Sequence, residues 1–151
     1  MKLRPHRCLI VVSDMDRSLA FYRDLLGMRL TRDAVRQGPS YDEILQTDGA
    51  RVRVAFVEAE ADGYPLELVE YLRPKSRKRS RQMSDVGAVR LCFEVGSVAR
   101  TLHTLKRRGL RHWRGPIILE RDGAKVAKLL YLNDPDGIEI EFIQTLRPKE
   151  D

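Results

Sequence analysis

Apolar and polar residues alternate along much of this chain and predict short strands, with two helical segments among them. Through Cys8–Val12 the pattern is that of a strand with one buried face. The segment that follows carries an apolar stripe at helical spacing: Leu19, Tyr22 and Leu26. This stripe predicts a helix over 15–26 that ends at Gly27. Ser13 or Asp14 can cap its first turn.

The same pattern occurs a second time. At an offset of 83 residues the two copies share these positions: Val12 and Val95, Arg17 and Arg100, Ser18 and Thr101, and Leu19 and Leu102. The second copy predicts a helix over 98–108 that ends at Gly109. Its inward residues are Leu102 and Leu105. A repeat of this kind indicates two tandem structural modules.

Four Asp-Gly pairs lie between strand-like runs, and this dipeptide favours tight hairpin turns. They are Asp48-Gly49, Asp62-Gly63, Asp122-Gly123 and Asp136-Gly137. The first two match the last two at an offset of 74, so the first half holds extra residues, which we place around Asp33–Tyr41. Each half is therefore predicted to have the element order β-α-β-β-β.

Length and composition indicate one globular domain without a membrane segment. The 151 residues are 42% hydrophobic and 33% charged, with a formal net charge of +6, which suits an anionic partner. No apolar run approaches the roughly 20 residues that cross a bilayer, and the first residues lack the apolar core of a signal peptide. Two cysteines, Cys8 and Cys92, make no disulfide framework, so we expect a reducing, cytoplasmic location.

A basic tract separates the two halves. Six of the nine residues in Arg73–Arg81 are Lys or Arg, and so charged a run does not pack in a core. Two interpretations stay open, a solvated connector and a patch that steers anions toward a nearby site. A third is a basic interaction module. Nucleic acid is not the expected partner, because no aromatic or helical recognition element accompanies the charge.

Four segments carry a recognisable pattern: LIVVSDMDRSLAFYRDLLGM, AFVEAEADGYPLELVEYLRP, GAVRLCFEV and YLNDPDGIEIEFIQ. They resemble the vicinal oxygen chelate (VOC) superfamily, which includes glyoxalase I, extradiol dioxygenases and bleomycin-resistance proteins. The resemblance implies an α+β fold, with two tandem βαβββ modules forming a curled mixed β-sheet cleft. A single VOC domain, residues 1–151, would then hold module one at about 4–72, a linker at about 73–84 and module two at about 86–145.

In this superfamily a divalent metal is held by one residue from the first and last strand of each module, typically His, Glu or Gln, His and Glu. Counting back from the start of the first helix, the first histidine position is Arg7, not its neighbour His6. The second histidine position is Arg90, which lies 83 residues further on. Matching LELVE with IEFIQ places Glu67 and Glu141 at the last-strand positions.

Strand alternation predicts which residues share the cleft with these four. Toward the helices we place Cys8, Ile10, Val12, Leu66, Leu68, Leu91, Phe93, Val95, Ile138, Ile140 and Phe142. Toward the cleft we place Leu9, Val11, Val69, Glu139 and Ile143. The first and last strands of such a module are neighbours, so we expect Arg7 beside Glu67 and Arg90 beside Glu141.

Two arginines at histidine positions change the expected chemistry. A guanidinium has no lone pair for a metal, whereas it forms bidentate pairs with carboxylates. We therefore expect no metal cofactor. The pairs either plug a vacated site or leave Arg7 and Arg90 to hold the carboxylate, phosphate or enolate of a ligand, with Glu67 or Glu141 as a candidate base. A site built in another way, for Fe, Mn, Ni or Zn, is the alternative.

Other residues carry weaker signals. His6 can reach the cleft only through a strand bulge, and His103 and His112 have no partner at metal-ligand spacing. Cys8 is expected to pack beneath the first helix, and Cys92 has no histidine nearby that would make it a nucleophile. Three aromatic residues are expected in the core or at the rim of the pocket: Tyr41, Phe56 and Tyr131.

These observations predict a cytoplasmic VOC protein, a homodimer by analogy, that binds a small anionic or aromatic molecule in its cleft. Whether it is an enzyme stays open; an enzymatic member would be lactoylglutathione lyase-like or dioxygenase-like. The alternatives are a metal-dependent lyase, isomerase or ring-cleaving dioxygenase, and the basic interaction module.

Overall fold

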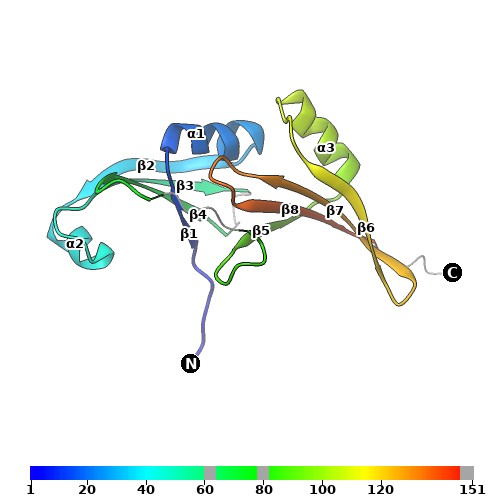
Figure 1. Ribbon diagram of the computed structural model, residues 1–151, viewed down its shortest axis with the longest axis horizontal. Coiled ribbons are helices and arrows are strands. Elements are labelled where there is room, and N and C mark those ends of the chain that lie inside the picture. The colour runs from blue at the N-terminus through cyan, green and yellow to red at the C-terminus, as the bar shows by residue number, and fades with distance from the viewer. Residues whose placement is uncertain (60–63, 78–81, 147–151) are drawn as a thin grey trace. The chain divides into compact units, whose positions relative to one another are not determined.

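The computed structural model describes residues 1–59, 64–77 and 82–146. The chain divides into two compact units, Met1–Arg79 and Ser80–Asp151. Each unit holds one four-stranded mixed sheet, with a helix that contacts its central strands (Figure 1). The two units confirm the predicted α+β class with two tandem modules.

The first unit has the order β-α-β-β-β with one added helix. Its elements are β1 (Cys8–Val12), α1 (Met15–Leu19), the π-helix η1 (Ala20–Leu25) that continues α1, β2 (Arg29–Gln37), α2 (Pro39–Leu45), β3 (Arg51–Glu58) and β4 (Leu66–Arg73). The strand order is β1-β4-β3-β2, with β1 and β4 parallel and the other pairs antiparallel. The last strand of the unit therefore lies inside the sheet, beside the first.

The second unit repeats this topology. Its elements are β5 (Arg90–Glu94), α3 (Val98–Arg107), β6 (Arg114–Arg121), β7 (Ala124–Asn133) and β8 (Glu139–Thr145), in the strand order β5-β8-β7-β6. Asp122-Gly123 joins β6 to β7 with φ of 51° and 78°, and a type I′ hairpin turn requires positive φ at both residues. Asp136-Gly137 joins β7 to β8, so both predicted turns of this unit are confirmed. Asp62-Gly63 lies outside the described residues.

Two details of the first unit differ from the sequence prediction. Asp48-Gly49 is not a hairpin turn, because α2 stands between β2 and β3. Pro39 begins that helix, where its fixed φ and missing N–H are tolerated, and α2 accounts for the extra residues of the first half. The helix predicted over 15–26 is α-helical only as far as α1 and then widens into η1, where the consecutive residues Phe21 and Tyr22 are both buried.

One part of the core of each unit lies between the sheet and its helix, α1 or α3. Seven of the residues predicted to face the helices are buried: Ile10, Val12, Leu66, Leu68, Leu91, Ile140 and Phe142. Four are half-buried: Cys8, Phe93, Val95 and Ile138. Within the described residues, no helix is long and apolar enough to cross a membrane.

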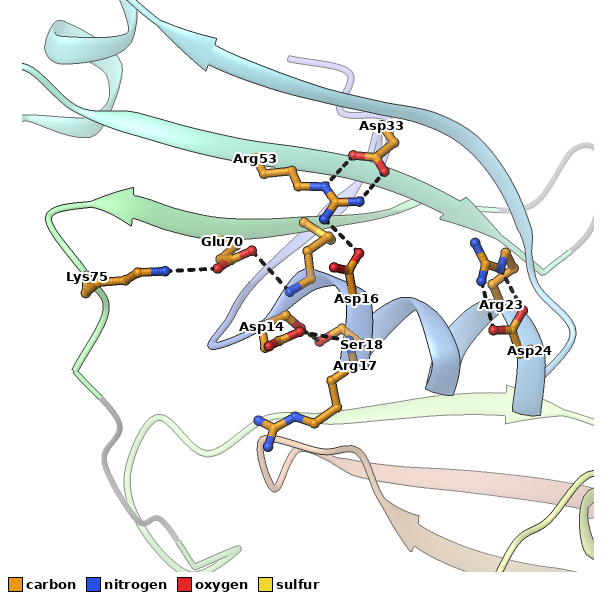
Figure 2. Close-up of polar contacts among 11 residues, drawn as sticks. Asp14, Asp16, Arg17, Ser18, Arg23, Asp24, Asp33, Arg53, Glu70 and Lys75 are labelled. Carbon is orange, nitrogen blue, oxygen red and sulfur yellow. Dashed lines mark hydrogen bonds and ion pairs between the residues drawn. The ribbon is translucent and has the colours of Figure 1, made fainter.

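Helix α1 is fastened to its sheet at its first turn (Figure 2). The Arg17 N–H donates to Asp14 Oδ1 at 2.9 Å, so Asp14 is the N-cap. The Met15 N–H donates to Glu70 Oε2 at 3.2 Å, and Glu70 belongs to β4. Two of the donors that a helix start leaves unpaired are thus satisfied, one of them by the neighbouring strand.

Helix α3 is fastened in the same way. The Arg100 N–H donates to Ser97 Oγ at 3.3 Å. The Val98 N–H donates to Gln144 Oε1 of β8 at 3.1 Å. The internal repeat therefore includes the bonds that hold each helix against its last strand.

Charged side chains support the first unit around α1. Arg53 of β3 donates to both carboxylate oxygens of Asp33 on β2, at 2.8 and 2.7 Å, and to Asp16 of α1 at 2.8 Å (Figure 2). The bond from Arg53 lowers the pKa of the Asp33 carboxyl. The guanidinium joins two strands and the helix.

The basic tract begins inside the first unit. Arg73 is the last residue of β4, and its Nε donates to the Gly49 carbonyl at 3.1 Å. Lys75 forms an ion pair with Glu70 at 3.2 Å. Residues 78–81 lie outside the described part of the chain. The first residues of the tract are therefore in contact with the sheet.

Removing the N-cap of α1 is expected to destabilise the protein. Asp14→Ala leaves the Arg17 N–H without its side-chain acceptor, and loss of an N-cap typically costs about 1 kcal/mol of unfolding free energy. Urea denaturation followed by circular dichroism measures this change. Glu43→Ala removes the same charge from an exposed position of α2 and should cost less than about 0.5 kcal/mol. Equal effects of the two variants would contradict the capping role.

Candidate functional site

Strand β1 presents two different faces, which burial distinguishes. Ile10 and Val12 are 6% and 0% exposed on the side of α1, whereas Leu9 and Val11 are 48% and 45% exposed on the other side. Side chains two residues apart share a face, so Arg7 belongs with Leu9. This separation of faces is as predicted. We call the sheet face that carries Leu9 in the first unit, and the equivalent face of the second sheet, the site face.

Arg7 and Glu67 meet on the site face of the first unit. Leu9 is the register partner of Glu67 in the parallel pair of β1 and β4, and Arg7 Nε forms an ion pair with Glu67 Oε2. Glu67 is 9% exposed, and among the described residues its Oε2 accepts no hydrogen bond besides this ionic contact. The Arg7 side chain is 43% exposed. The predicted adjacency is confirmed, with the guanidinium half open to solvent.

Arg90 is held by two carboxylates on the site face of the second unit. Its register partner in β8 is Glu139, and Arg90 Nε donates to Glu139 Oε2 at 2.6 Å. Arg90 Nη1 donates to Glu141 Oε2 at 3.0 Å. Burial lowers the pKa of Arg90, but the bond to Glu139 and the two carboxylate charges outweigh it and leave the pKa raised. Arg90 therefore lies beside Glu141 as predicted, but its shorter bond is to Glu139.

A single row of side chains crosses the second sheet on this face. The register joins one residue from each strand: Cys92, Glu141, Tyr131 and Arg114. Cys92 Sγ donates to Glu141 Oε1 at 3.2 Å. Arg114 Cζ lies 4.0 Å from the centre of the Tyr131 ring, which is within cation–π range.

Arg90 and Arg114 share partners, which closes the network. Arg114 Nη2 donates to Glu139 Oε1 at 2.8 Å, so one carboxylate bonds both guanidinium groups. Arg90 Cζ lies 5.0 Å from the centre of the Tyr131 ring. Burial is the largest cause that raises the pKa of the Tyr131 hydroxyl, and the bond to Glu141 raises it further. Two cationic and two anionic side chains are balanced here.

The first sheet carries the corresponding row. Its members, in register, are Leu9, Glu67, Phe56 and Arg32. Arg32 Cζ lies 5.8 Å from the centre of the Phe56 ring. Each row thus leads from a glutamate through an aromatic ring to an arginine, and the internal repeat extends to the site face.

Arg32 and Arg114 are the residues of these rows that the sequence prediction missed. The strand pairing shifts register between Leu30 and Arg32 in β2, and again after Arg114 in β6. Such irregularities interrupt the alternation from which faces are assigned. The offset of 83 also aligns Arg114 with Thr31, whereas an offset of 82 would have paired the two arginines.

The other predicted candidates take no part in these rows. His6, His103 and His112 are exposed. Cys8 is half-buried, as expected of a packed cysteine. Tyr41 of α2 packs on a buried cluster: Val52, Val54 and Val69. Over residues 1–59, 64–77 and 82–146, no three His, Cys, Asp or Glu side chains converge as a metal ion would require.

Comparison with known proteins places the chain in a family. The sequence model of the Glyoxalase/Bleomycin resistance protein/Dioxygenase superfamily matches residues 4–142. The chain belongs to this superfamily. A lactoylglutathione lyase of Haemophilus influenzae is 28% identical over 143 residues, which are 93% of this chain and 92% of the relative. The predicted VOC membership is thereby confirmed.

Solved structures of the superfamily share the fold. A glyoxalase family protein from Bacillus cereus matches with a TM-score of 0.80 at 20% identity, over 97% of each chain. TnmS3, an antibiotic binding protein from Streptomyces sp. CB03234, matches with a TM-score of 0.62 at 21% identity, over 97% of this chain and 99% of its own. At these identities the likeness concerns the fold.

The divalent metal usual in the superfamily does not fit the side chains at the four positions that the sequence analysis assigns to its ligands. Arg7 and Arg90 offer guanidinium groups, which have no lone pair to donate. Glu67 and Glu141 are each paired with one of these cations. Two carboxylates without imidazole or thiolate are a poor donor set for a transition metal.

Cys92 is expected to react slowly with alkylating agents at neutral pH. Burial and the bond to Glu141 raise the pKa of its thiol to about 11, and only the thiolate is nucleophilic. In a Cys8→Ser background, the iodoacetamide rate measured by mass spectrometry should therefore keep rising about tenfold per pH unit from pH 7 to pH 10. With Glu141→Gln added, the rate should level off at a lower pH than in the Cys8→Ser background, because the charge that raises the pKa of the Cys92 thiol is removed. Levelling near pH 9, the ordinary thiol value, would contradict the raised pKa.

Proposed function

We propose that this VOC-superfamily protein binds a small anionic molecule without the usual divalent metal. The observation that supports this is the presence of guanidinium groups at both histidine positions, Arg7 against Glu67 and Arg90 against Glu141. A guanidinium repels a cation and binds an oxyanion through parallel N–H donors. The replacement converts a place for a cation into one for an anion.

The exposed donors and neighbouring rings indicate the class of ligand. Arg7 carries five N–H donors, of which Glu67 engages Nε, and the side chain is 43% exposed. Carboxylate, phosphate and enolate oxygens are the acceptors that match such a donor set. Phe56 and Tyr131 lie beside arginines of the two rows, which favours a ligand with an aromatic or other flat part.

Known proteins of this fold include binders and enzymes. TnmS3 is an antibiotic binding protein, which supports a binding role. The relative from Haemophilus influenzae is a lactoylglutathione lyase, which favours a metal-dependent lyase as the second candidate. If the chain is an enzyme, Glu67 and Glu141 are the candidate bases, because each lies beside an arginine that would hold the substrate anion.

We further infer a reducing, cytoplasmic setting, since Cys8 and Cys92 are both free thiols. A homodimer is inferred by analogy with the superfamily. Size-exclusion chromatography with light scattering tests the oligomeric state, and elution as a monomer would contradict it.

Protein purified without chelator is expected to contain far less than one divalent metal ion per chain. The guanidinium groups of Arg7 and Arg90 occupy the places of two neutral ligands and repel a cation. Mass spectrometry of the metal content, followed by titration with Mn²⁺, Fe²⁺, Ni²⁺ and Zn²⁺, measures this. Stoichiometric metal that disappears in Glu67→Ala or Glu141→Ala would overturn the metal-free proposal in favour of the lyase.

Small carboxylates and aromatic acids are expected to raise the melting temperature of the protein. A thermal-shift screen identifies them, because a ligand that binds only the folded state stabilises it. The ligand-induced rise in melting temperature should shrink in at least one of the two site variants, Arg7→Gln and Arg90→Gln. Arg23→Gln removes an arginine from η1, where it pairs with Asp24, and should leave the ligand-induced shift unchanged. Shifts that persist in both site variants would count against arginine-mediated binding.

A further inference from the structure

The two site faces differ at one position that sets their charge. Glu139 lies two residues before Glu141 in β8 and bonds two arginines. The first unit has Pro65 two residues before Glu67, and the Pro65 carbonyl accepts the Cys8 N–H at 3.1 Å. Arg7 and Arg32 are therefore accompanied by one glutamate, Glu67, whereas Arg90 and Arg114 bond two, Glu139 and Glu141.

The arginines of the second unit are already engaged. Arg90 donates to Glu139 and Glu141 through Nε and Nη1, and Arg114 shares Glu139. The side chains of the two glutamates are only 11% and 12% exposed. The Arg114 side chain is 57% exposed. An anion that bonded both guanidinium groups would still have to displace the Glu139 carboxylate that they share, which costs more than binding to a guanidinium without a carboxylate partner.

The arginines of the first unit have fewer carboxylate partners. Arg32 is exposed, and within the part of the chain that the structure describes its side chain contacts the Phe56 ring and forms no ion pair. Among the described residues, Arg7 forms an ion pair with Glu67 alone, and its side chain is 43% exposed. Glu58 is paired with Arg29, so Arg7 and Arg32 together keep one positive charge that no described carboxylate pairs with.

The two guanidinium groups lie over neighbouring strands. Arg7 contacts Glu67 on β4, Arg32 lies over Phe56 on β3, and Glu67 and Phe56 are register partners. Adjacent strands are about 4.8 Å apart, so the partners of the two guanidinium groups lie one strand spacing from each other. Two residues along the strands, Val54 and Val69 continue the face as an apolar pair covered by α2.

We propose that the anion binds in the first unit, with Arg7 and Arg32 as its cationic partners and Phe56 against its flat apolar part. The ligand class is a planar carboxylate, most simply an aromatic acid. Arg90 and Arg114 then serve the second unit as a closed, neutral network. This assignment rests on the proposed function, which names an anion but not the unit that binds it.

Calorimetric titration of 2-naphthoate into the full chain at low salt tests the assignment. Arg32→Gln should raise the Kd at least about tenfold, because a charge-assisted pair is lost. Pro65→Glu should raise it by a similar factor, because it gives Arg7 the second carboxylate that Arg90 has. Arg114→Gln is the matched control in the second unit and should change the Kd less than about twofold. Circular dichroism of each variant confirms that it is folded.

The alternative outcomes separate the two proposals. A loss of affinity for 2-naphthoate in Arg114→Gln that equals or exceeds the loss in Arg32→Gln would overturn the assignment to the first unit. The proposed anion binding itself would still stand. Unchanged affinity in folded Pro65→Glu would overturn it too. Inorganic phosphate that binds as tightly as 2-naphthoate would remove the role of Phe56. If neither probe binds the unaltered chain, the proposed function fails, and this inference fails with it.

Discussion

The parallel pairing of the first and last strand in each unit is the constraint on which both the fold and the site depend. It places β4 and β8 inside their sheets, where alternate side chains act on opposite faces. Glu70 of β4 caps α1 on one face, while Glu67 holds Arg7 on the other. In β8, Gln144 and Glu141 divide the same tasks. In each unit a single strand therefore bonds the helix on one face and positions the charged side chains on the other. The fold and the site depend on the same short stretch of sequence.

The ion pairs on the site faces are not explained by stability alone. Desolvation offsets most of the attraction between partly buried charges, and the Arg7 and Arg90 side chains are 43% and 35% exposed. The same row of glutamate, aromatic ring and arginine occurs on both sheets. Beside the second row, Glu139 balances the additional arginine Arg90, whereas no described carboxylate does the same for Arg7 and Arg32. The second unit has Glu139 at the position where the first has Pro65, and this single difference has a large electrostatic effect. Under the proposed assignment, the first copy of the repeat binds the ligand and the second keeps a closed network of ion pairs.

Local periodicity accounts for what the sequence predicted. Alternation, caps and turn residues gave the β-α-β-β-β order and the faces of β1. The family resemblance pointed to Arg7 and Arg90, and the repeat agreed, because the two positions lie 83 residues apart. Helix α2 was missed because the segment lacks an apolar stripe of helical length, and Asp48-Gly49 imitates a hairpin turn. The two row arginines, Arg32 and Arg114, lie at register shifts that interrupt alternation. The bond of Arg90 to its register partner in β8 depends on strand pairing, which no local pattern contains.

The chemistry of the site depends on whether the two arginines exclude a metal, and a calorimetric Ni²⁺ titration tests this most directly. The comparison is between the unaltered chain and the double variant Arg7→His, Arg90→His, which restores two imidazole donors beside Glu67 and Glu141. We expect no stoichiometric binding to the unaltered chain and saturable binding to the double variant, because imidazole has the lone pair that a guanidinium lacks. Stoichiometric binding to the unaltered chain, as tight as to the double variant, would contradict the replacement of the metal by arginine.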